Sequence, residues 1–421
     1  MSLRLSFPKT IPVRALLLAV ALPLAWPALA APVSLQQALG SSDVERLEQL
    51  AHGRGPQASL AQAVALSLRR QDDQAQPALE KVAGSTAAAA ERAAALQELS
   101  ALHSRHGRYA AAAKALDASA QLKPLDQEGE QTRSFFRALA DVAPMRVDPS
   151  PQARLPVKRD AAGLVRVDGS AEGRVQDFVV DTGAAFSTAT ASAVKRLGLR
   201  MLDTEATVSS ASRDSVATRF AVASELVLDG AVLHDVVFIV VPDEALSFGN
   251  GAYRIDAILG LPVFLDLGRL AVEMQDGREW LLLGAAAPRT TEAPNLMLSG
   301  VQPLLLARSE AAGRTLRLFI DTGAGSTLLY RNAADEAPRI AHGAVTKAVT
   351  LGGAGGSSTD SEARALPRFD VRVGATVAEL SNVTLLSKVL PDRHGAVGQD
   401  LLRQGRGYVM DFDRMCMSLL R

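Results

Sequence analysis

The stretch RVQDFVVDTGAAFSTATASAVKRLGL (174–199) runs from an apolar segment directly into an acid. The apolar residues Phe-Val-Val read as the end of a buried strand, and Asp181-Thr182-Gly183 follows at once. One Asp-Thr-Gly is weak evidence by itself, because three common residues recur by chance. The rest of the chain must show whether Asp181 only ends a strand or also takes part in catalysis.

The same motif occurs again in RLFIDTGAGSTLL (317–329), 140 residues later. Two apolar residues and a glycine follow each copy at nearly the same distance, 79 residues after the first Asp in IDAILGLPVFL (255–265) and 77 after the second in HGAVGQDLL (394–402). From about residue 150 onward, short alternating runs rich in Val, Thr and Gly indicate β-strands. The sequence therefore predicts an all-β region built from two copies of one lobe.

In these motifs, residues 150–421 resemble the retropepsin-like aspartic proteases, whose lobes carry apolar-apolar-Asp-Thr/Ser-Gly-Ala and a later Ile-Leu-Gly-type motif. The resemblance implies a two-lobed acid-protease fold, with two pseudo-symmetric retropepsin-like β lobes in one chain. It also implies an aspartic-type endopeptidase that acts on a protein or peptide substrate. It does not extend to residues 31–140.

The chemistry explains why two acids are needed. Peptide hydrolysis without a metal, serine or cysteine requires an activated water and an acid. Two carboxyl groups about 3 Å apart cannot both ionise easily, so they share one proton. The ionised group takes a proton from water, and the protonated group stabilises the developing oxyanion. Asp181 and Asp321 are therefore the predicted catalytic residues, one from each lobe.

Residues around the two acids are expected to support the active-site loops. Glycines after the acids would let backbone N–H groups approach the carboxylates, and later glycines would let a strand pack closely behind the loops. The resemblance implies that two threonines form hydrogen bonds between the lobes and that apolar residues back the loops. The supporting residues are Thr182, Gly183, Ala184, Thr322, Gly323 and Ala324, and the backing residues are Ile258, Leu259, Gly260, Val397 and Gly398.

Two departures from pepsin-like lobes bear on activity. Ala184 and Ala324 stand three residues after the acids, where pepsin-like lobes have a hydroxyl. One hydrogen bond fewer to each carboxylate predicts a less acidic pair and activity at mildly acidic pH. The resemblance also implies that hairpins near 207–220 and 349–364 are flaps that cover the substrate. Neither hairpin contains an obvious tyrosine.

Residues 31–145 have a different composition, rich in Ala, Leu, Gln, Glu and Arg, which predicts helices. Within them, 94–124 resembles one tetratricopeptide repeat, and an irregular helical hairpin domain is the alternative. We expect lobe one at 150–284, a Pro- and Thr-rich linker at 285–298 and lobe two at 299–421.

The N-terminus, residues 1–30, has the basic, apolar and small-residue parts of a secretory signal peptide, with cleavage expected before Ala31. Its apolar run is short and interrupted by proline, and no second long run follows, so we expect no stable membrane insertion. Cys416 is the single cysteine, which excludes an intrachain disulfide. Export without disulfides favours a bacterial periplasm.

The composition and motifs also limit which partners and cofactors the protein is expected to bind. Lys and Arg together number 45, as do Asp and Glu, and the resulting zero net charge argues against nucleic-acid binding. The histidines show no metal-ligand spacing, and neither G-x-S-x-G nor H-E-x-x-H occurs. The sequence thus predicts no metal and no cofactor.

Two other functions remain open at this point: a catalytically weak peptide-binding or assembly module, and a periplasmic tetratricopeptide-like scaffold. Two intact Asp-Thr-Gly motifs favour the enzyme, because a binding module gains nothing from two acids that repel each other. The helical domain could bind a protein partner, shield the cleft or act as a pro-segment.

Overall fold

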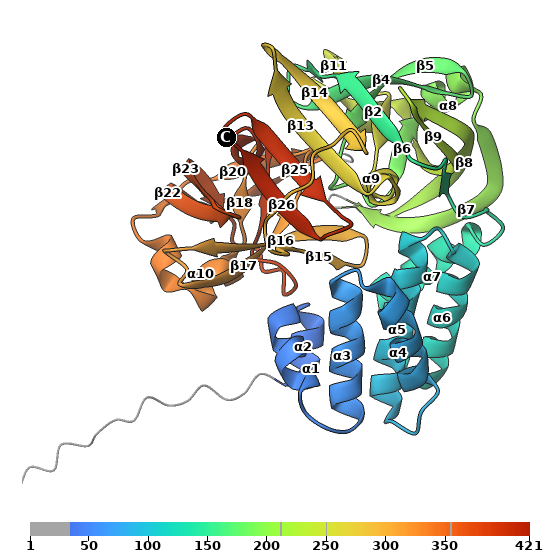
Figure 1. Ribbon diagram of the computed structural model, residues 1–421, viewed down its shortest axis with the longest axis vertical. Helices are drawn as coiled ribbons and strands as arrows, with labels where there is room; N and C mark the ends of the chain where they lie inside the picture. Colours follow the sequence, from blue (N-terminus) through green and yellow to red (C-terminus); the bar gives the residue numbers. More distant parts are fainter. Residues whose placement is uncertain (1–33, 211–212, 250, 354–355) are drawn as a thin grey trace, which may run out of the picture.

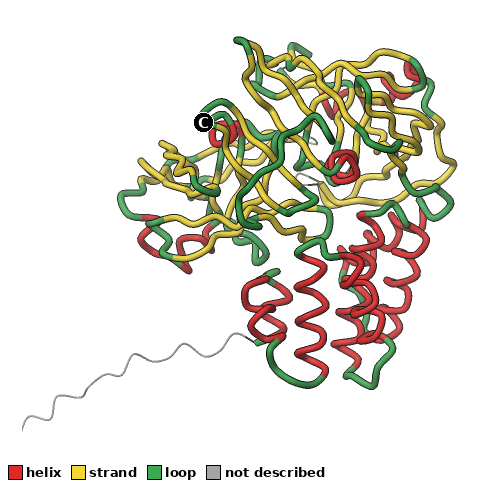
Figure 2. The backbone as a smooth tube through the Cα atoms, in the orientation of Figure 1, coloured by secondary structure: helices red, strands yellow, loops and turns green. Residues whose placement is uncertain are grey.

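The chain is described by a computed structural model that covers residues 34–421 except 211–212, 250 and 354–355. A helical domain comes first and two β lobes follow, which confirms the predicted fold class. The helices lie below both lobes in Figure 1, and helix is concentrated in that part of the chain in Figure 2. The predicted signal peptide, 1–30, lies outside the described residues.

The helical domain consists of short helices joined by tight turns. Side chains of Ser34 and Asp126 accept hydrogen bonds from the first turns of α1 and α7, which satisfies N–H groups that a helix start leaves free. The resemblance of 94–124 to a tetratricopeptide repeat stays a prediction. The helices are α1 (Leu35–Gly40), α2 (Val44–Ala51), α3 (Pro56–Leu68), α4 (Asp72–Ala83), α5 (Ala89–Arg105), α6 (Tyr109–Leu122) and α7 (Gln127–Ala138).

Lobe one is built on a nine-stranded sheet. Its strands are β1 (Arg146–Val147), β3 (Lys158–Arg159), β4 (Val165–Ala171), β5 (Arg174–Val180), β6 (Ser187–Thr190), β7 (Arg200–Ser210), β8 (Arg213–Leu228), β9 (Ala231–Val241) and β12 (Ala257–Leu259). Helix α8 (Ala191–Leu197), the 3-10 helix η1 (Asp243–Leu246) and the small pair β10 (Ser247–Phe248) and β11 (Tyr253–Arg254) complete it.

Lobe two is built on an eight-stranded sheet. Its strands are β15 (Leu296–Ser299), β16 (Gln302–Ser309), β17 (Arg314–Ile320), β18 (Leu328–Leu329), β19 (Val345–Thr346), β22 (Arg364–Val373), β23 (Thr376–Leu385) and β24 (Gly395–Val397). It also contains α10 (Arg331–Glu336), the 3-10 helix η2 (Pro338–Ala341), α11 (Gln399–Leu402) and the separate hairpin β20 (Val349–Gly353) and β21 (Gly356–Asp360).

The two lobes share one strand arrangement around the Asp-Thr-Gly motifs. In lobe one, β12 pairs in parallel with β5 and antiparallel with β6. In lobe two, β24 pairs in parallel with β17 and antiparallel with β18. Both Asp residues therefore follow a central strand whose parallel neighbour carries the later apolar-apolar-Gly motif, as a duplicated lobe requires.

A five-stranded sheet joins the lobes. Its order is β2 (Gln152–Pro156), β14 (Arg278–Gly284), β13 (Arg269–Gln275), β25 (Gly407–Asp411) and β26 (Cys416–Leu420), and α9 (Leu261–Leu267) precedes β13. The antiparallel pair β13 and β25 crosses from one lobe to the other. One large hydrophobic core includes buried residues of both lobes and of this sheet. The lobes are therefore a single folded unit.

The domain limits differ from the predicted ones. Strand β15 begins at Leu296, so lobe two begins inside the predicted linker 285–298. Strand β1 starts at Arg146 and pairs with β9, so the sheet of lobe one begins before residue 150. The short β1 and β15 were missed because their position is set by pairing with strands distant in the sequence.

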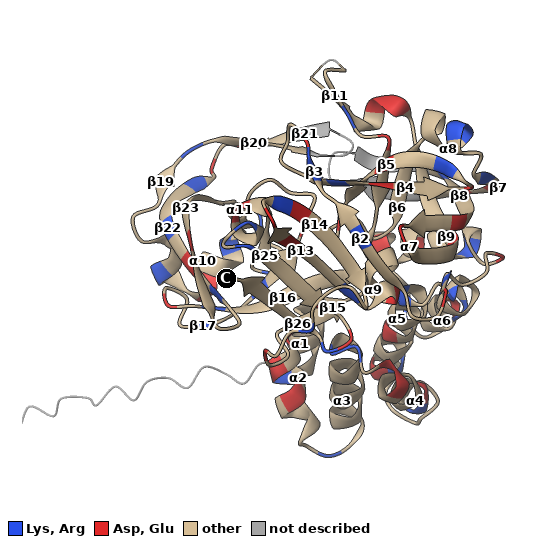
Figure 3. Cartoon of the chain, turned by 45° about the horizontal axis from the view of Figure 1, so that its top comes forward, with Lys and Arg blue, Asp and Glu red and all other residues tan. Residues whose placement is uncertain are grey.

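Lys or Arg and Asp or Glu residues alternate along both lobes and the helical domain in Figure 3, without a long run of one sign. Within the described part of the chain, no helix has the length and apolar character needed to cross a membrane.

Candidate active site

Asp181 and Asp321 each begin a loop at the end of a central strand. The backbone N–H of Asp181 donates to the carbonyl of Leu259 at 3.0 Å, and that of Asp321 donates to Val397, also at 3.0 Å. Beside Leu259, Ile258 pairs in register with β5. The apolar residues predicted to back the loops thus lie on the parallel strands directly behind the two acids.

The structure brings the two carboxyl groups into hydrogen-bonding contact with each other. One oxygen of Asp181 accepts from the Gly183 N–H at 2.8 Å, and one of Asp321 accepts from the Gly323 N–H at 3.0 Å. Each glycine also lies against the acid of the other lobe. A methyl group on Gly183 would fall 2.6 Å from Asp321 Oδ1, and one on Gly323 would fall 2.5 Å from Asp181 Oδ2.

The environment makes this pair a weaker acid than ordinary aspartates. Burial raises the pKa of Asp181, although N–H groups of Gly183, Ala184 and Gly323 oppose the change. Burial and the nearby charge of Asp181 raise the pKa of Asp321 to about 7. Below about pH 7 the pair therefore retains a proton, and its titration belongs to the pair rather than to either residue.

Two buried threonines connect the lobes beneath the carboxyl groups. The Thr182 hydroxyl donates to the Ile320 carbonyl at 2.9 Å, and the Thr322 hydroxyl donates to the Val180 carbonyl at 2.9 Å. Each hydroxyl also accepts from the other threonine's N–H, at 2.9 and 3.3 Å. Thr182 is 1% exposed and Thr322 is fully buried, so water cannot replace these bonds.

We expect Thr182→Val to lower the free energy of unfolding by about 2–4 kcal/mol, because it leaves the Ile320 carbonyl and the Thr322 N–H without this partner in a buried site. Urea denaturation measures the loss. Thr182→Ser keeps the hydroxyl and is the matched control, expected to lose much less. Equal stability of the valine and serine variants would contradict the prediction.

Glycines behind the loops permit close contact. A methyl group on Gly260 would lie 2.5 Å from the carbonyl carbon of Phe186, and one on Gly398 would lie 2.5 Å from that of Ser326. The carbonyls of Ala184 and Ala324 accept hydrogen bonds from the residues that follow these glycines, both at 2.9 Å. The loops and the strands behind them are thus joined in the same way in both lobes.

Sequence reasoning missed two hydroxyl residues with symmetric roles. The Gly260 N–H donates to Ser187 Oγ at 3.1 Å, and the Gly398 N–H donates to Thr327 Oγ1 at 3.2 Å. Ser187 and Thr327 both stand six residues after their Asp. A hydroxyl at one offset in both copies is the signal that could have identified them.

An asymmetric support for the second loop was also missed. Gln399 Nε2 donates to the Thr322 carbonyl at 2.7 Å. Arg159 donates to Gln399 Oε1 at 2.7 Å and forms two bonds of 2.7 Å with Glu279. Lobe one has Leu261 at the place of Gln399, so the duplication offers no clue to this arrangement.

The predicted flaps correspond to two hairpins. Strands β7 and β8 form the first hairpin and pair antiparallel as far as Ser210 and Arg213. Strands β20 and β21 form the second hairpin. In Figure 3 the β20–β21 hairpin reaches from lobe two towards lobe one. The second hairpin ends at Asp360, before the predicted limit of 364. Both turn tips lie outside the described residues.

In the described ranges, no group of three or more His, Cys, Asp or Glu side chains is placed to hold a metal ion. The polar groups that face each other at the lobe boundary are the two carboxyls and the backbone N–H groups around them. This arrangement can hold a proton between two acids and an activated water beside them.

Two lobes of the same topology, each contributing an Asp-Thr-Gly loop to a shared pair, define the two-lobed acid-protease fold. Comparison with known proteins agrees for the first lobe: residues 165–263 match the Asp_protease_2 family, described as aspartyl protease. The match spans β4 to α9 and includes Asp181 and Gly260. It supports an aspartic protease relationship.

No curated protein matches the sequence. Among solved structures, the chain is similar to the crystal structure of basic 7S globulin from soybean, with 13% identity and a TM-score of 0.40. The similarity covers 64% of this chain and 94% of the soybean chain. The fold assignment rests on the strand order and register described above.

Proposed function

We propose that this protein is an aspartic endopeptidase in which Asp181 and Asp321 activate a water molecule between the lobes. The observation that carries the proposal is the hydrogen-bonded, half-buried pair of carboxyls, held in the same way by the two symmetric loops. A structural role does not need this arrangement, because two acids in contact destabilise a fold when both ionise.

The chemistry follows from the different states of the two acids. Asp181, the ionised partner, takes a proton from water as the water oxygen attacks the peptide carbonyl carbon. Asp321, the protonated partner, donates its proton to the carbonyl oxygen. A tetrahedral diol forms. As it collapses, the C–N bond breaks, the proton on Asp181 passes to the leaving nitrogen, and one diol hydroxyl returns its proton to Asp321. The pair returns to its starting state with one shared proton.

The remaining details are part of the same proposal. The substrate is an extended segment of a protein or peptide that pairs with the two flap hairpins through its backbone. We propose a bacterial periplasm as its location, which the predicted signal peptide supports. A protein partner bound by the helical domain stays one of the roles proposed for that domain.

The test is a pH–rate profile for cleavage of a mixed peptide library, with products identified by mass spectrometry. We expect activity at mildly acidic pH and its loss as the pH rises past about 7, because Asp321 then gives up the shared proton. Chelating agents should leave the rate unchanged. If the wild-type chain cleaves no peptide anywhere between about pH 3 and 9, the result would instead favour a peptide-binding module. This interval extends to both sides of the pKa of Asp321.

Stability should follow pH in a defined direction. Because the folded-state pKa of Asp321 is above its ordinary value of 3.8, the folded chain binds more protons than the unfolded chain between about pH 4 and 7. The pair's contribution to stability is therefore greatest below this window and falls as the pH rises through it. Urea midpoints of the wild type and Asp321→Asn measure this slope, which the variant should reduce.

A further inference from the structure

The two active-site loops differ at one position that the catalytic chemistry does not explain. Five residues after the acid, lobe one has Phe186 and lobe two has Ser326. The backbone of each residue lies directly against a motif glycine, that of Phe186 against Gly260 and that of Ser326 against Gly398. Ser326 is exposed, whereas Phe186 is partly buried. The aromatic ring therefore has a role that its symmetric counterpart lacks.

The ring of Phe186 packs into the helical domain. Its centroid lies 4.8 Å from that of Phe135 in α7 and 6.0 Å from that of Tyr109 in α6. Phe135 in turn packs edge-on against Phe220 of β8, at 4.9 Å. Tyr109, Phe135 and Phe220 are each at most 6% exposed. At Phe186, the backbone of the first catalytic loop thus packs against Gly260, and the aromatic ring packs against α6 and α7.

The same helices support the hairpin predicted to be the first flap. Thr204 of β7 donates its hydroxyl hydrogen to the carbonyl of Ala138, the last residue of α7, at 2.6 Å. Ala206 and Val222 of this hairpin belong to the hydrophobic cluster formed with α6 and α7. Loop and hairpin stem therefore rest on one surface.

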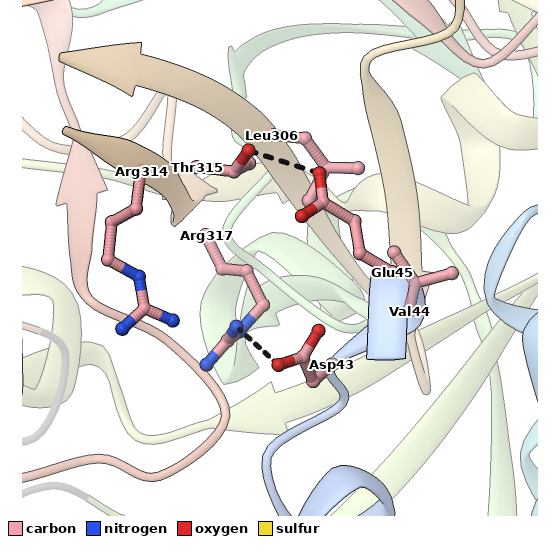
Figure 4. A pocket seen from close by; sticks show the side chains of 7 residues that line it. All are labelled: Asp43, Val44, Glu45, Leu306, Arg314, Thr315 and Arg317. Atoms are coloured by element: carbon pink, nitrogen blue, oxygen red, sulfur yellow. Dashed lines mark hydrogen bonds and ion pairs between the residues drawn. The ribbon is translucent and has the colours of Figure 1, made fainter. Parts of the chain in front are cut away.

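The opposite end of the helical domain contacts lobe two. Met297 and Leu304 are fully buried in one cluster with residues of α1 to α5. Thr315 donates to Glu45 at 3.0 Å, and Arg317 lies 3.9 Å from Asp43, as Figure 4 shows. Thr315 and Arg317 belong to β17, the strand that leads to Asp321.

One arginine of the helical domain contacts lobe one and the sheet that joins the lobes. Arg70, in the turn between α3 and α4, donates to the Leu265 carbonyl at 2.8 Å and to the Phe412 carbonyl at 2.7 Å. Leu265 lies in α9 of lobe one, and Phe412 follows β25. Arg70 has a φ of 56°, a left-handed conformation that costs energy in a residue other than glycine. The surrounding contacts hold it in this conformation.

We propose that the helical domain is a permanent brace for the two catalytic loops and that Phe186 is the positioning residue through which it holds the loop of Asp181. The inference rests on the proposed function, because the geometry it maintains is that of the catalytic pair. It argues against a removable pro-segment, since cutting the helices away would expose the apolar surfaces around Phe220 and Leu304 to water.

The test compares three variants of the full chain. Phe186→Ser introduces the residue of lobe two, Phe186→Leu keeps an apolar side chain, and Leu79→Ala creates a cavity in α4 within the helical core, away from both loops. Peptide cleavage gives kcat and KM, urea denaturation gives stability, and hydrogen exchange by mass spectrometry follows the backbone amides of 181–187.

We expect Phe186→Ser to lower kcat by about 10- to 100-fold with KM changed less than about threefold, because a misplaced catalytic group slows the chemical step. Exchange at 181–187 should become faster. Phe186→Leu should recover most of kcat. Leu79→Ala should lose stability but keep kcat within about twofold, because the hydrophobic cluster that contains Leu79 includes no residue of either catalytic loop.

Two results would overturn the proposal. The first is a folded Phe186→Ser variant with wild-type kcat and wild-type exchange at 181–187. The second is a fall in kcat for Leu79→Ala equal to that for Phe186→Ser, which would make general destabilisation the cause. If Phe186→Ser does not fold, Phe186→Leu must show a smaller change of the same kind. If the wild type cleaves no peptide, the proposed function fails, and hydrogen exchange alone decides whether Phe186 holds the loop.

Discussion

Asp181→Asn and Asp321→Asn, made separately, are each expected to reduce peptide cleavage by about 10³- to 10⁴-fold. An asparagine has nearly the shape of a protonated aspartic acid, so either variant preserves the packing of the pair. It can neither take a proton from water nor donate one to the substrate, and proton transfer by a positioned carboxyl accounts for a rate factor of this order. Steady-state cleavage of one peptide identified in the library assay measures both losses.

The folded state of both variants should survive. Above about pH 7, Asp321→Asn removes the charge that is buried next to Asp181, so this variant should be at least as stable as the wild type. Asp276→Asn is the matched control, because Asp276 is exposed in a turn with a φ of 51° that asparagine also tolerates. Wild-type cleavage by either active-site variant, with the fold intact, would refute the catalytic pair.

Gly323→Ala is expected to reduce cleavage by about 100-fold or more while leaving stability nearly unchanged. The added methyl group would lie 2.5 Å from Oδ2 of Asp181 and 2.6 Å from its Cγ. This carboxyl group is the end of a side chain, so it can swing away more easily than the backbone can shift. The fold is thereby kept, but the acid loses its catalytic position, and displacement by about 1 Å can cost this much in rate.

Gly325→Ala provides the control two residues further along the same loop. A methyl group there would have as its nearest neighbour the Ala162 carbonyl oxygen at 3.9 Å, which is an ordinary contact. We expect this variant to cleave peptides at the wild-type rate. Comparable losses at Gly323 and Gly325 would mean that the loop backbone, and not the carboxyl of Asp181, limits the reaction.

The proposed brace changes how the N-terminal region is understood. Its helices were predictable from composition, but the three roles open to the domain could not be separated by sequence. The structure places its aromatic residues against the first catalytic loop and puts residues of α1 to α5 in one cluster with lobe two. Such contacts favour a part that acts within the enzyme over one that is removed.

Much of the candidate site could be predicted because the chain contains it twice. The repeated Asp-Thr-Gly and the repeated apolar-apolar-Gly at similar offsets identify strands, loops and acids together, since independent coincidences at matched spacing are rare. The supports that occur only once escaped this reasoning. Arg159 and Gln399 are 240 residues apart, and the sequence carries no pattern that connects them.

The sequence by itself determined that the chain holds two β lobes, each with one acid after a buried strand, because local strand patterns and an internal repeat are written in the order of residues. Only the tertiary structure decided that Asp181 and Asp321 meet, that Thr182 and Thr322 join the lobes, and that Phe186 packs on the helices. These contacts depend on how separate elements pack in space. Hydrophobic burial drives that packing without direction, so close geometric fit, and not sequence spacing, selects the partners.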